Sequence, residues 1–257
     1  MAVLRSIVLA LATFTRIPLP QLDWEQANKR HILAALPLVG LIIGALLWLW
    51  FLLCNVLGIH SLLFAAGLTL IPVLVTGGIH LDGYCDTVDA LSSRASTDQK
   101  QAILKDPHIG TFAVIGVVVY LLVYFALCAE LEQKTQMVLL LGAIAVLSRA
   151  AGGFASLVFT PAKSSYLLDT LHKAASKQAV FVCILWFVFA VAVACLLDWL
   201  SAVALIGVIL LVTLYVRIMS KRQFGGMSGD LAGYLIQLVE LGALIALVVV
   251  EKVMALV

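Results

Sequence analysis

The stretch "ILAALPLVGLIIGALLWLWFLLC", residues 32–54, contains no charged side chain. A helix of this length rises about 1.5 Å per residue, enough to cross the roughly 30 Å hydrocarbon core of a bilayer. The whole chain has the same character, because 63% of its 257 residues are hydrophobic and only 12% are charged. Soluble domains carry about one quarter charged residues. The sequence therefore predicts an all-α integral membrane protein, built as a polytopic helical bundle.

Further apolar runs follow the first, and together they predict seven membrane-spanning helices. The expected spans are residues 32–54, 61–78, 109–129, 137–159, 179–197, 200–217 and 231–250. Pro37 and Pro72 fall inside the first two spans and predict kinks there. Residues 1–16 are apolar but too short to cross alone, so we expect an interfacial or re-entrant helix that ends at Pro18 and Pro20. No repeat or soluble domain is visible, which predicts a single transmembrane domain over residues 1–257.

The basic residues are distributed asymmetrically over the expected connections. Of 16 Lys and Arg residues, 13 fall on one side of the membrane if there are seven spans, Lys134 and Lys252 fall on the other, and Arg149 lies within a span. Cytoplasmic loops carry an excess of Lys and Arg. We therefore expect the N-terminus in the cytoplasm, the C-terminus outside, and residues 79–108 in a cytoplasmic active-site loop. A net charge of +2 gives no reason to expect a nucleic-acid partner.

The stretch "HLDGYCDTVDAL", residues 80–91, is the most acidic part of this loop. Spacings of four and three residues bring Asp82, Asp86 and Asp89 to one face of a helix, where the carboxylates repel each other unless a cation lies among them. Carboxylate oxygens without cysteine or paired histidines favour a hard ion, Mg²⁺ or Mn²⁺. We expect these three residues to bind one or two such ions. The alternative is a solvated acidic helix face.

The neighbouring residues add groups suited to a phosphate ligand. Glycine lets a diphosphate approach the backbone, basic side chains stabilise phosphate charge, and the first turn of the third span offers free N–H groups to an anion. We predict catalytic roles for His80, Arg94 and Lys105, a fourth metal ligand in Asp106, and substrate contacts from Gly83, Gly110 and Thr111. A structural histidine and ordinary loop charges are the alternative interpretations of His80, Arg94 and Lys105.

Two expected spans carry ionisable residues. Arg149 lies in the fourth span, where a charge is costly and requires an acidic partner or an anionic ligand. The seventh span begins with a glycine-rich loop and Asp230, and Glu240 follows within the helix. Asp230 is interpreted as an N-cap or a site carboxylate, and Glu240 as a partner of Arg149 or a lining residue of the substrate cavity. All three are candidate substrate-binding residues.

Five motifs resemble, in order, those of the adenosylcobinamide-GDP ribazoletransferases, the cobalamin synthases of bacteria and archaea. They are "FTRIPLP" (14–20), "TGGIHLDGYCDTVDAL" (76–91), "ILKDPHIGTF" (103–112), "SRAAGG" (148–153) and "GGMSGDLAGYLIQLVEL" (225–241). The chain departs from the family pattern at His108, Ala113 and Gln237, and over 161–177.

The resemblance implies a Mg²⁺-dependent transferase of the bacterial inner membrane. Such an enzyme joins adenosylcobinamide-GDP to α-ribazole, or to its 5′-phosphate, and releases GMP and adenosylcobalamin or its phosphate. This is the last assembly step of the cobalamin nucleotide loop. Membrane lipid is an implied partner, and the resemblance leaves open a homo-oligomer and contacts with other enzymes of cobalamin biosynthesis.

Two other function classes remain open at this point. The D-G-x-x-D-x-x-D string of residues 82–89 is similar to part of the motif of CDP-alcohol phosphotransferases. A transporter that uses Arg149 and Glu240 as its pathway is the second, and it predicts discontinuous helices and repeated halves.

Overall fold

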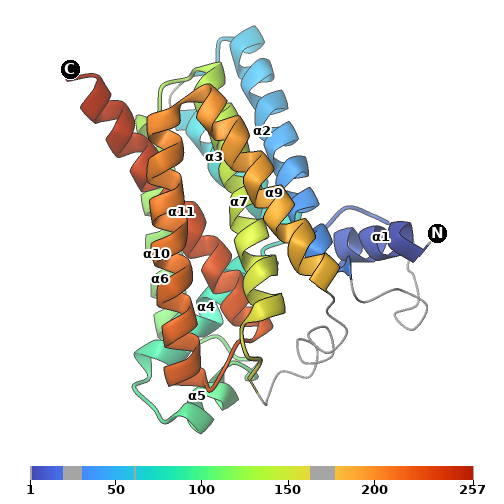
Figure 1. Ribbon diagram of the computed structural model, residues 1–257. Coiled ribbons are helices and arrows are strands. Elements are labelled where there is room, and N and C mark those ends of the chain that lie inside the picture. The colour runs from blue at the N-terminus through green and yellow to red at the C-terminus, as the bar shows by residue number, and fades with distance from the viewer. Residues whose placement is uncertain (1, 20–30, 61, 163–176, 257) are drawn as a thin grey trace.

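The structure is a computed structural model that describes residues 2–19, 31–60, 62–162 and 177–256 (Figure 1). Over these residues the chain is helical, apart from short connections and one isolated backbone bridge, so the all-α prediction is confirmed. The helices are α1 (Ala2–Phe14), η2 (Leu33–Ala35), α2 (Leu36–Leu57), α3 (Leu62–Thr76), α4 (Ile79–Ser92), α5 (Thr97–Ile103), α6 (Thr111–Glu130), α7 (Thr135–Val158), α9 (Lys177–Leu197), α10 (Trp199–Phe224) and α11 (Gly229–Met254).

Six of the described helices are long and apolar enough to cross a membrane, namely α2 with η2, α6, α7, α9, α10 and α11. The second expected span is different. Helix α3 has 15 residues, which gives about 22 Å of helix, and it meets α4 at an angle of 92°. The span expected over 61–78 therefore corresponds to α3, which is long enough to count as a span only together with α4, and the total is six spans, or seven if this bent pair counts as one. The short apolar helix at the N-terminus is confirmed as α1, which lies across the bundle direction in Figure 1.

The two prolines do not act alike. Pro37 lies in the first turn of α2, so the predicted kink at this position is wrong. Proline is tolerated there because the first turn leaves its N–H groups without helical partners. Pro72 lies inside α3, and its carbonyl oxygen accepts a hydrogen bond from the Thr76 hydroxyl at 2.8 Å. Helix α3 ends at Thr76, one turn after this proline.

Helix α7 forms the centre of the bundle and packs against α2, α9 and α11. Its contact with α2 depends on small residues, because a Cβ atom on Gly40 would overlap the Ala145 carbonyl and one on Gly44 would come within 3.1 Å of the Gly142 Cα. Close backbone approach of this kind is typical of helix pairs in membranes, where packing rather than water exclusion drives association. Helices α6, α9 and α10 are the least buried of the six long apolar helices, as expected for helices at the lipid-facing surface of a bundle.

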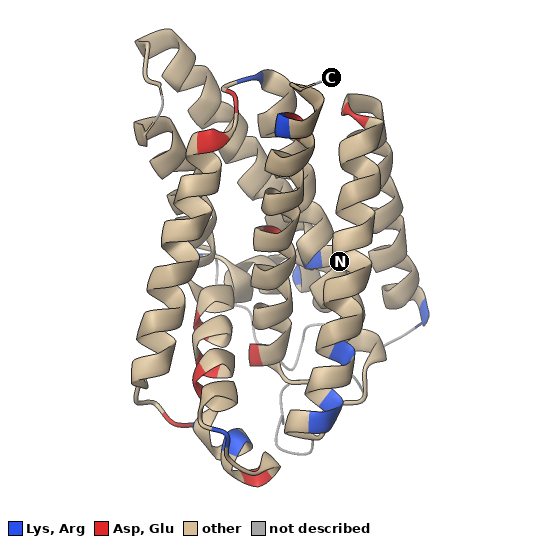
Figure 2. Ribbon diagram, turned by 90° about the vertical axis from the view of Figure 1, so that its left-hand side faces the viewer, with Lys and Arg blue, Asp and Glu red and all other residues tan. Residues whose placement is uncertain are grey.

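The expected loop over 79–108 is mostly helix, since it contains α4 and α5. Helix α5 begins with a capping box between Ser96 and Gln99, and it lies at one end of the bundle. Figure 2 shows many of the described Lys and Arg residues toward this end. Lys134 and Lys252 belong to the opposite end, where Lys252 pairs with Glu130 at the end of α6. The basic residues predicted at 29, 30, 163 and 173 lie outside the described residues.

Candidate active site

The junction of α3 and α4 depends on two glycines. Gly77 and Gly78 have φ angles of 64° and 81°, in the left-handed region that favours glycine. The Gly78 N–H donates to the Val73 carbonyl at 3.0 Å and thereby closes α3. Gly78 is also the N-cap of α4, so the chain turns from one helix into the next without a loop. This turn bends the chain by 92°, and the acidic segment then packs against α11 and α6.

The contact between α4 and α11 is made by backbone. A Cβ atom on Gly83 would lie 2.7 Å from the Asp230 carbonyl oxygen, and one on Gly233 would lie 2.8 Å from the His80 carbonyl oxygen. This approach brings Asp230 beside α4. The N-cap of α11 is Ser228, whose hydroxyl accepts from the Leu231 N–H at 3.2 Å. The N-cap interpretation of Asp230 is therefore wrong, and its carboxylate lies in the first turn of α11.

Three carboxylates lie along α4 as the spacing predicts. Asp82 is exposed, and Asp86 and Asp89 are half-buried; we call these three residues the acidic face. Asp86 is close enough to Asp82, Asp89 and Asp230 to be repelled by all three. In the described part of the chain, none of these four carboxylates has an ion-pair partner. The acidic face thus carries negative charge that the described side chains do not neutralise.

The side chain of Asp89, near the end of α4, lies beside the N-terminus of α6. A Cβ atom on Gly110, the N-cap of that helix, would overlap the Asp89 carboxylate. The helix N-terminus attracts negative charge, and here the nearby anion is a side chain of the protein itself. Gly110 and the exposed Thr111 are therefore brought to the acidic face through Asp89.

The described residues contain no group of three or more His, Cys, Asp and Glu side chains placed to hold a metal ion. Mg²⁺ usually takes only one or two protein carboxylates and keeps several waters. The acidic face supplies oxygen donors of this kind and needs positive charge, so its chemistry fits such an ion.

His80 lies on the opposite side of α4 from the acidic face. Its imidazole is buried and stacks against Phe14, with ring centroids 6.1 Å apart. Residues two positions apart in a helix are separated by about 200° around its axis, which explains why the His80 and Asp82 side chains point to opposite sides of α4. The Nε2 atom of His80 has no hydrogen-bond partner among the described residues. The structure does not bring His80 to the aspartates.

The loop before α6 contains the predicted fourth metal ligand. The Asp106 carboxylate accepts from the His108 backbone N–H at 2.9 Å and contacts the His108 ring Nδ1 at 2.7 Å. The backbone bond and then the ring contact lower the pKa of Asp106. Asp106 and Lys105 are exposed, and the structure does not group Asp106 with the acidic face. Arg94 lines a different cavity, together with Lys100 and Arg222.

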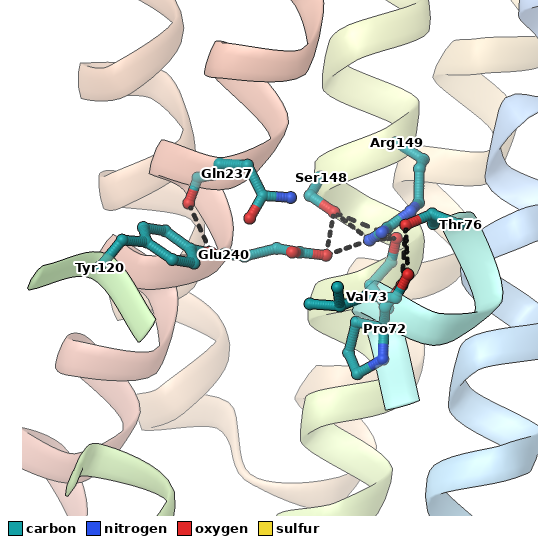
Figure 3. A network of polar contacts seen from close by, with 9 residues as sticks. Pro72, Val73, Thr76, Tyr120, Ser148, Arg149, Gln237 and Glu240 are labelled. Carbon is teal, nitrogen blue, oxygen red and sulfur yellow. Dashed lines mark hydrogen bonds and ion pairs between the residues drawn. The ribbon is translucent and has the colours of Figure 1, made fainter. Parts of the chain in front are cut away.

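The buried charges of α7 and α11 pair with each other (Figure 3). Arg149 and Glu240 form an ion pair with almost no solvent exposure, and the Ser148 hydroxyl contributes to both partners. The predicted partner of Arg149 is therefore confirmed. Glu240 also lines a cavity of about 10 Å³ with Thr76, Tyr120 and other residues, which is about the space one water requires. This cavity is far too small for a nucleotide.

Arg16, which the sequence did not single out as a candidate, contacts the junction of α3 and α4. The Arg16 backbone N–H donates to the Val75 carbonyl at 2.8 Å. The Arg16 side chain lies so close to Gly77 that a Cβ atom on Gly77 would overlap it. Beside this contact lies a cavity of about 510 Å³, which we call the break cavity, lined by Gly77, Gly78, Ile79, Leu81, Asp82, Cys85 and Val117. The motif "FTRIPLP" marked this arginine, but nothing in the sequence indicates that it meets a glycine 61 positions later.

Comparison with known proteins gives a consistent result over nearly the whole chain. The profile of the cobalamin-5-phosphate synthase family matches residues 6–248. An adenosylcobinamide-GDP ribazoletransferase of Lachnoclostridium phytofermentans is 37% identical, covering 97% of this chain and 95% of that protein. Proteins of the same name are 32% identical in Clostridium perfringens, over 95% of this chain and 97% of that protein, and 33% identical in Listeria monocytogenes, over 90% and 92%.

No solved structure matches the chain. The full-length matches, the six to seven spanning helices and the intact acidic segment agree with one another. The chain belongs to the cobalamin-5-phosphate synthase family, the adenosylcobinamide-GDP ribazoletransferases, and is a multi-pass membrane protein.

Proposed function

We propose that this chain carries out the ribazoletransferase reaction of its family at the acidic face of α4, beside the break cavity. The family implies adenosylcobinamide-GDP and α-ribazole as substrates. The observation that carries the location is the environment of Asp86, which three other carboxylates repel and which has no described ion-pair partner. A diphosphate alone would add to this repulsion, so the site requires a cation together with the substrate.

Asp82, Asp86 and Asp89 are the residues that would hold Mg²⁺, with Asp230 as a further donor beside Asp86. Mn²⁺ fits the same oxygen donors. When bound, such an ion neutralises diphosphate oxygens and stabilises the charge that develops in phosphoryl transfer. Asp106 remains a proposed ligand, because it lies four residues before Gly110, which contacts Asp89.

The reaction exchanges one phosphorus–oxygen bond for another. A ribose hydroxyl of the ribazole attacks the phosphorus on the cobinamide side, the new O–P bond forms, and the bond to GMP breaks. The hydroxyl proton goes to a base. We assign this role to a carboxylate of the acidic face instead of His80, because His80 is buried on the other side of α4.

Two cations are proposed for the phosphate oxygens. Arg16 contacts Gly77, and Gly77 and Asp82 both line the break cavity. The first turn of α4 begins at the same cavity, and its N–H groups favour an anion. Lys105 is exposed in the loop that leads to Gly110. Arg94 opens onto a separate cavity at the end of α4, so we do not assign it to the diphosphate.

The orientation follows from the distribution of basic residues. We propose that the end of the bundle with α5 faces the cytoplasm and that the C-terminus lies outside, as the excess of Lys and Arg indicates. The acidic face then opens toward the compartment that contains nucleotides and Mg²⁺.

α-Ribazole and its 5′-phosphate both remain acceptors in this proposal. The 5′-phosphate has no free 5′-hydroxyl, so a different ribose hydroxyl would be the attacking group common to both.

The test is GMP release by the purified protein in lipid nanodiscs, supplied with adenosylcobinamide-GDP, α-ribazole and Mg²⁺. We expect GMP to form with wild type and with Asp98→Asn, an exposed control on α5, and to be nearly lost with Asp86→Asn. A CDP-activated alcohol that released CMP at a comparable rate would instead favour the CDP-alcohol phosphotransferases. Full turnover by Asp86→Asn would place the reaction elsewhere.

A further inference from the structure

A second polar cavity lies at the end of the bundle that carries α5. It has a volume of about 510 Å³ and is formed by the end of α4, by α5 and by the last turns of α10. Arg94, Lys100 and Arg222 contribute to its walls, and none of its described lining residues is acidic. We call it the basic cavity. It shares no lining residue with the break cavity.

The three cations of the basic cavity are poorly neutralised. Lys100 is only 6% exposed, and the partner of its ammonium group is the neutral Gln223 side chain, with 2.5 Å between Nζ and Oε1. Within the described chain, neither Arg94 nor Arg222 forms an ion pair. A buried ammonium group without an anionic partner is costly, and the exposed Arg94 and Arg222 line the same cavity, so an anion bound there would meet all three cations.

The position of Arg94 is also specific. Arg94 has a φ of 52° and is the one non-glycine residue of the described chain with a positive φ. Residues other than glycine rarely adopt this backbone conformation. The capping box of α5 begins two residues later and fixes the chain after it. The surrounding structure therefore holds this arginine at the cavity in spite of the backbone cost.

A lipid-facing stripe of α10 leads to the basic cavity. Leu211, Tyr215 and Ile218 are 70%, 48% and 44% exposed and are spaced by four and three residues, and Arg222 follows after four more. The stripe from Leu211 to Arg222 is about 16 Å long, similar to the hydrocarbon thickness of one leaflet. Tyr215 and Ile218 also line the cavity. The apolar surface and the cations thus form one continuous surface.

We infer that the basic cavity binds the phosphate headgroup of an anionic phospholipid whose acyl chains lie along this stripe of α10. The cations alone would suit any phosphate. A free phosphate or nucleotide, however, gains nothing from an exposed apolar stripe, whereas a phospholipid uses both parts. Basic pockets between membrane helices bind anionic headgroups by the same combination of charge and depth. This inference is independent of the proposed active site.

The test compares lipid retention by two neighbouring charge variants. Arg222→Gln removes a cavity cation, and Lys221→Gln removes an exposed charge from the adjacent position, which does not line the cavity. The protein is purified in detergent with equal amounts of phosphatidylglycerol and phosphatidylcholine, and bound lipid is counted by native mass spectrometry. We expect wild type and Lys221→Gln to retain phosphatidylglycerol preferentially, and Arg222→Gln to lose about fivefold in this preference, as one interfacial cation provides.

Competition identifies the ligand class. Inorganic phosphate and GMP, each added in excess, should leave phosphatidylglycerol bound. Full displacement by either would overturn the lipid assignment in favour of a soluble phosphate ligand. An equal loss in both variants would overturn the site itself, because general surface charge would then explain the preference. Arg222 is exposed, so the variant is expected to fold, and its thermal unfolding in detergent verifies this.

Discussion

Glu240 and Asp86 are both carboxylates of membrane-associated helices, but their surroundings in the fold are opposite. Glu240 is buried and pairs with Arg149 inside the bundle. Asp86 is half-buried, faces three other carboxylates and has no described ion-pair partner. The first charge is neutralised by the fold, whereas the second is left for something that binds. This difference agrees with our proposal that the buried pair stabilises the fold and that the acidic face binds metal and substrate.

The largest expected effect tests the structural half of this comparison. Glu240→Ala leaves the Arg149 guanidinium buried without its partner, which is expected to destabilise the protein by about 3–5 kcal/mol. The readout is thermal or denaturant unfolding in detergent. The double variant Arg149→Met with Glu240→Leu removes both charges and is expected to be markedly more stable than Glu240→Ala. If the double variant is no better, the cost arises from lost packing and not from an unpaired charge.

The next effect tests the catalytic half. Asp86→Asn is expected to lower kcat/KM for GMP release by roughly 100-fold or more, because a metal ion contributes several kcal/mol to such a reaction. The same change removes repulsion from Asp82, Asp89 and Asp230, so the melting temperature is expected to stay equal or rise. A parallel loss of activity and stability would contradict the comparison, since Asp86 would then be a structural residue like Glu240.

Binding of Mg²⁺ gives a control that does not depend on turnover. A ligand present at 100 times its Kd stabilises the folded state by about 2.7 kcal/mol. Wild-type protein is therefore expected to melt at a higher temperature with Mg²⁺ than with a chelator, and Asp86→Asn is expected to lose most of this difference. Asp98→Asn, which changes an exposed acid on α5, should keep it.

A smaller effect concerns the contact between α4, which carries Asp86, and α11, which carries Asp230 and Glu240. A Cβ atom on Gly83 would lie 2.7 Å from the Asp230 carbonyl oxygen, where the backbones of α4 and α11 meet. Gly83→Val is expected to destabilise the protein by about 1–3 kcal/mol through overpacking and to lower GMP release by moving Asp230 away from Asp86. Gly207→Val, in α10 with open space around the same atom, is the matched control and should change neither. Equal behaviour of the two variants would remove Gly83 from the site.

Much of this arrangement could be predicted from the sequence, because it follows from local patterns. Apolar run length predicted the spanning helices, and spacing placed Asp82, Asp86 and Asp89 on one helix face. The cost of an intramembrane charge predicted a partner for Arg149. The expected span ended at residue 78, close to the end of α3, but the helix α4 that follows at an angle of 92° was not predicted, because residues 79–108 were expected to form a loop and the bend depends on the backbone conformation of Gly77 and Gly78.

Contacts between distant segments were beyond reach of the sequence. The proximity of Asp230 to α4 depends on the crossing of two helices at Gly83 and Gly233, and the contact of Arg16 with Gly77 depends on the bend. The bend also bears on the transporter alternative, which predicted a discontinuous helix. One is present, but the full-length family match assigns the chain to an enzyme family.

The smallest expected effect belongs to a third kind of carboxylate, Asp106, which is paired but exposed. The His108 backbone N–H, and then its ring, lower the pKa of Asp106. The ionised form is therefore favoured in the folded protein, and the small stability that this provides is present above the ordinary pKa of about 3.9 and lost as the pH falls through the lower folded value. Carbon-13 NMR of the Asp106 carboxyl group is expected to show this depressed pKa. His108→Ala should raise it only partway, because the backbone N–H remains and is the larger cause. A complete return to the ordinary pKa would mean that the His108 ring alone is responsible and that the backbone N–H does not hold the carboxylate. The Asp106 carboxylate would then be freer to bind a metal ion at the acidic face.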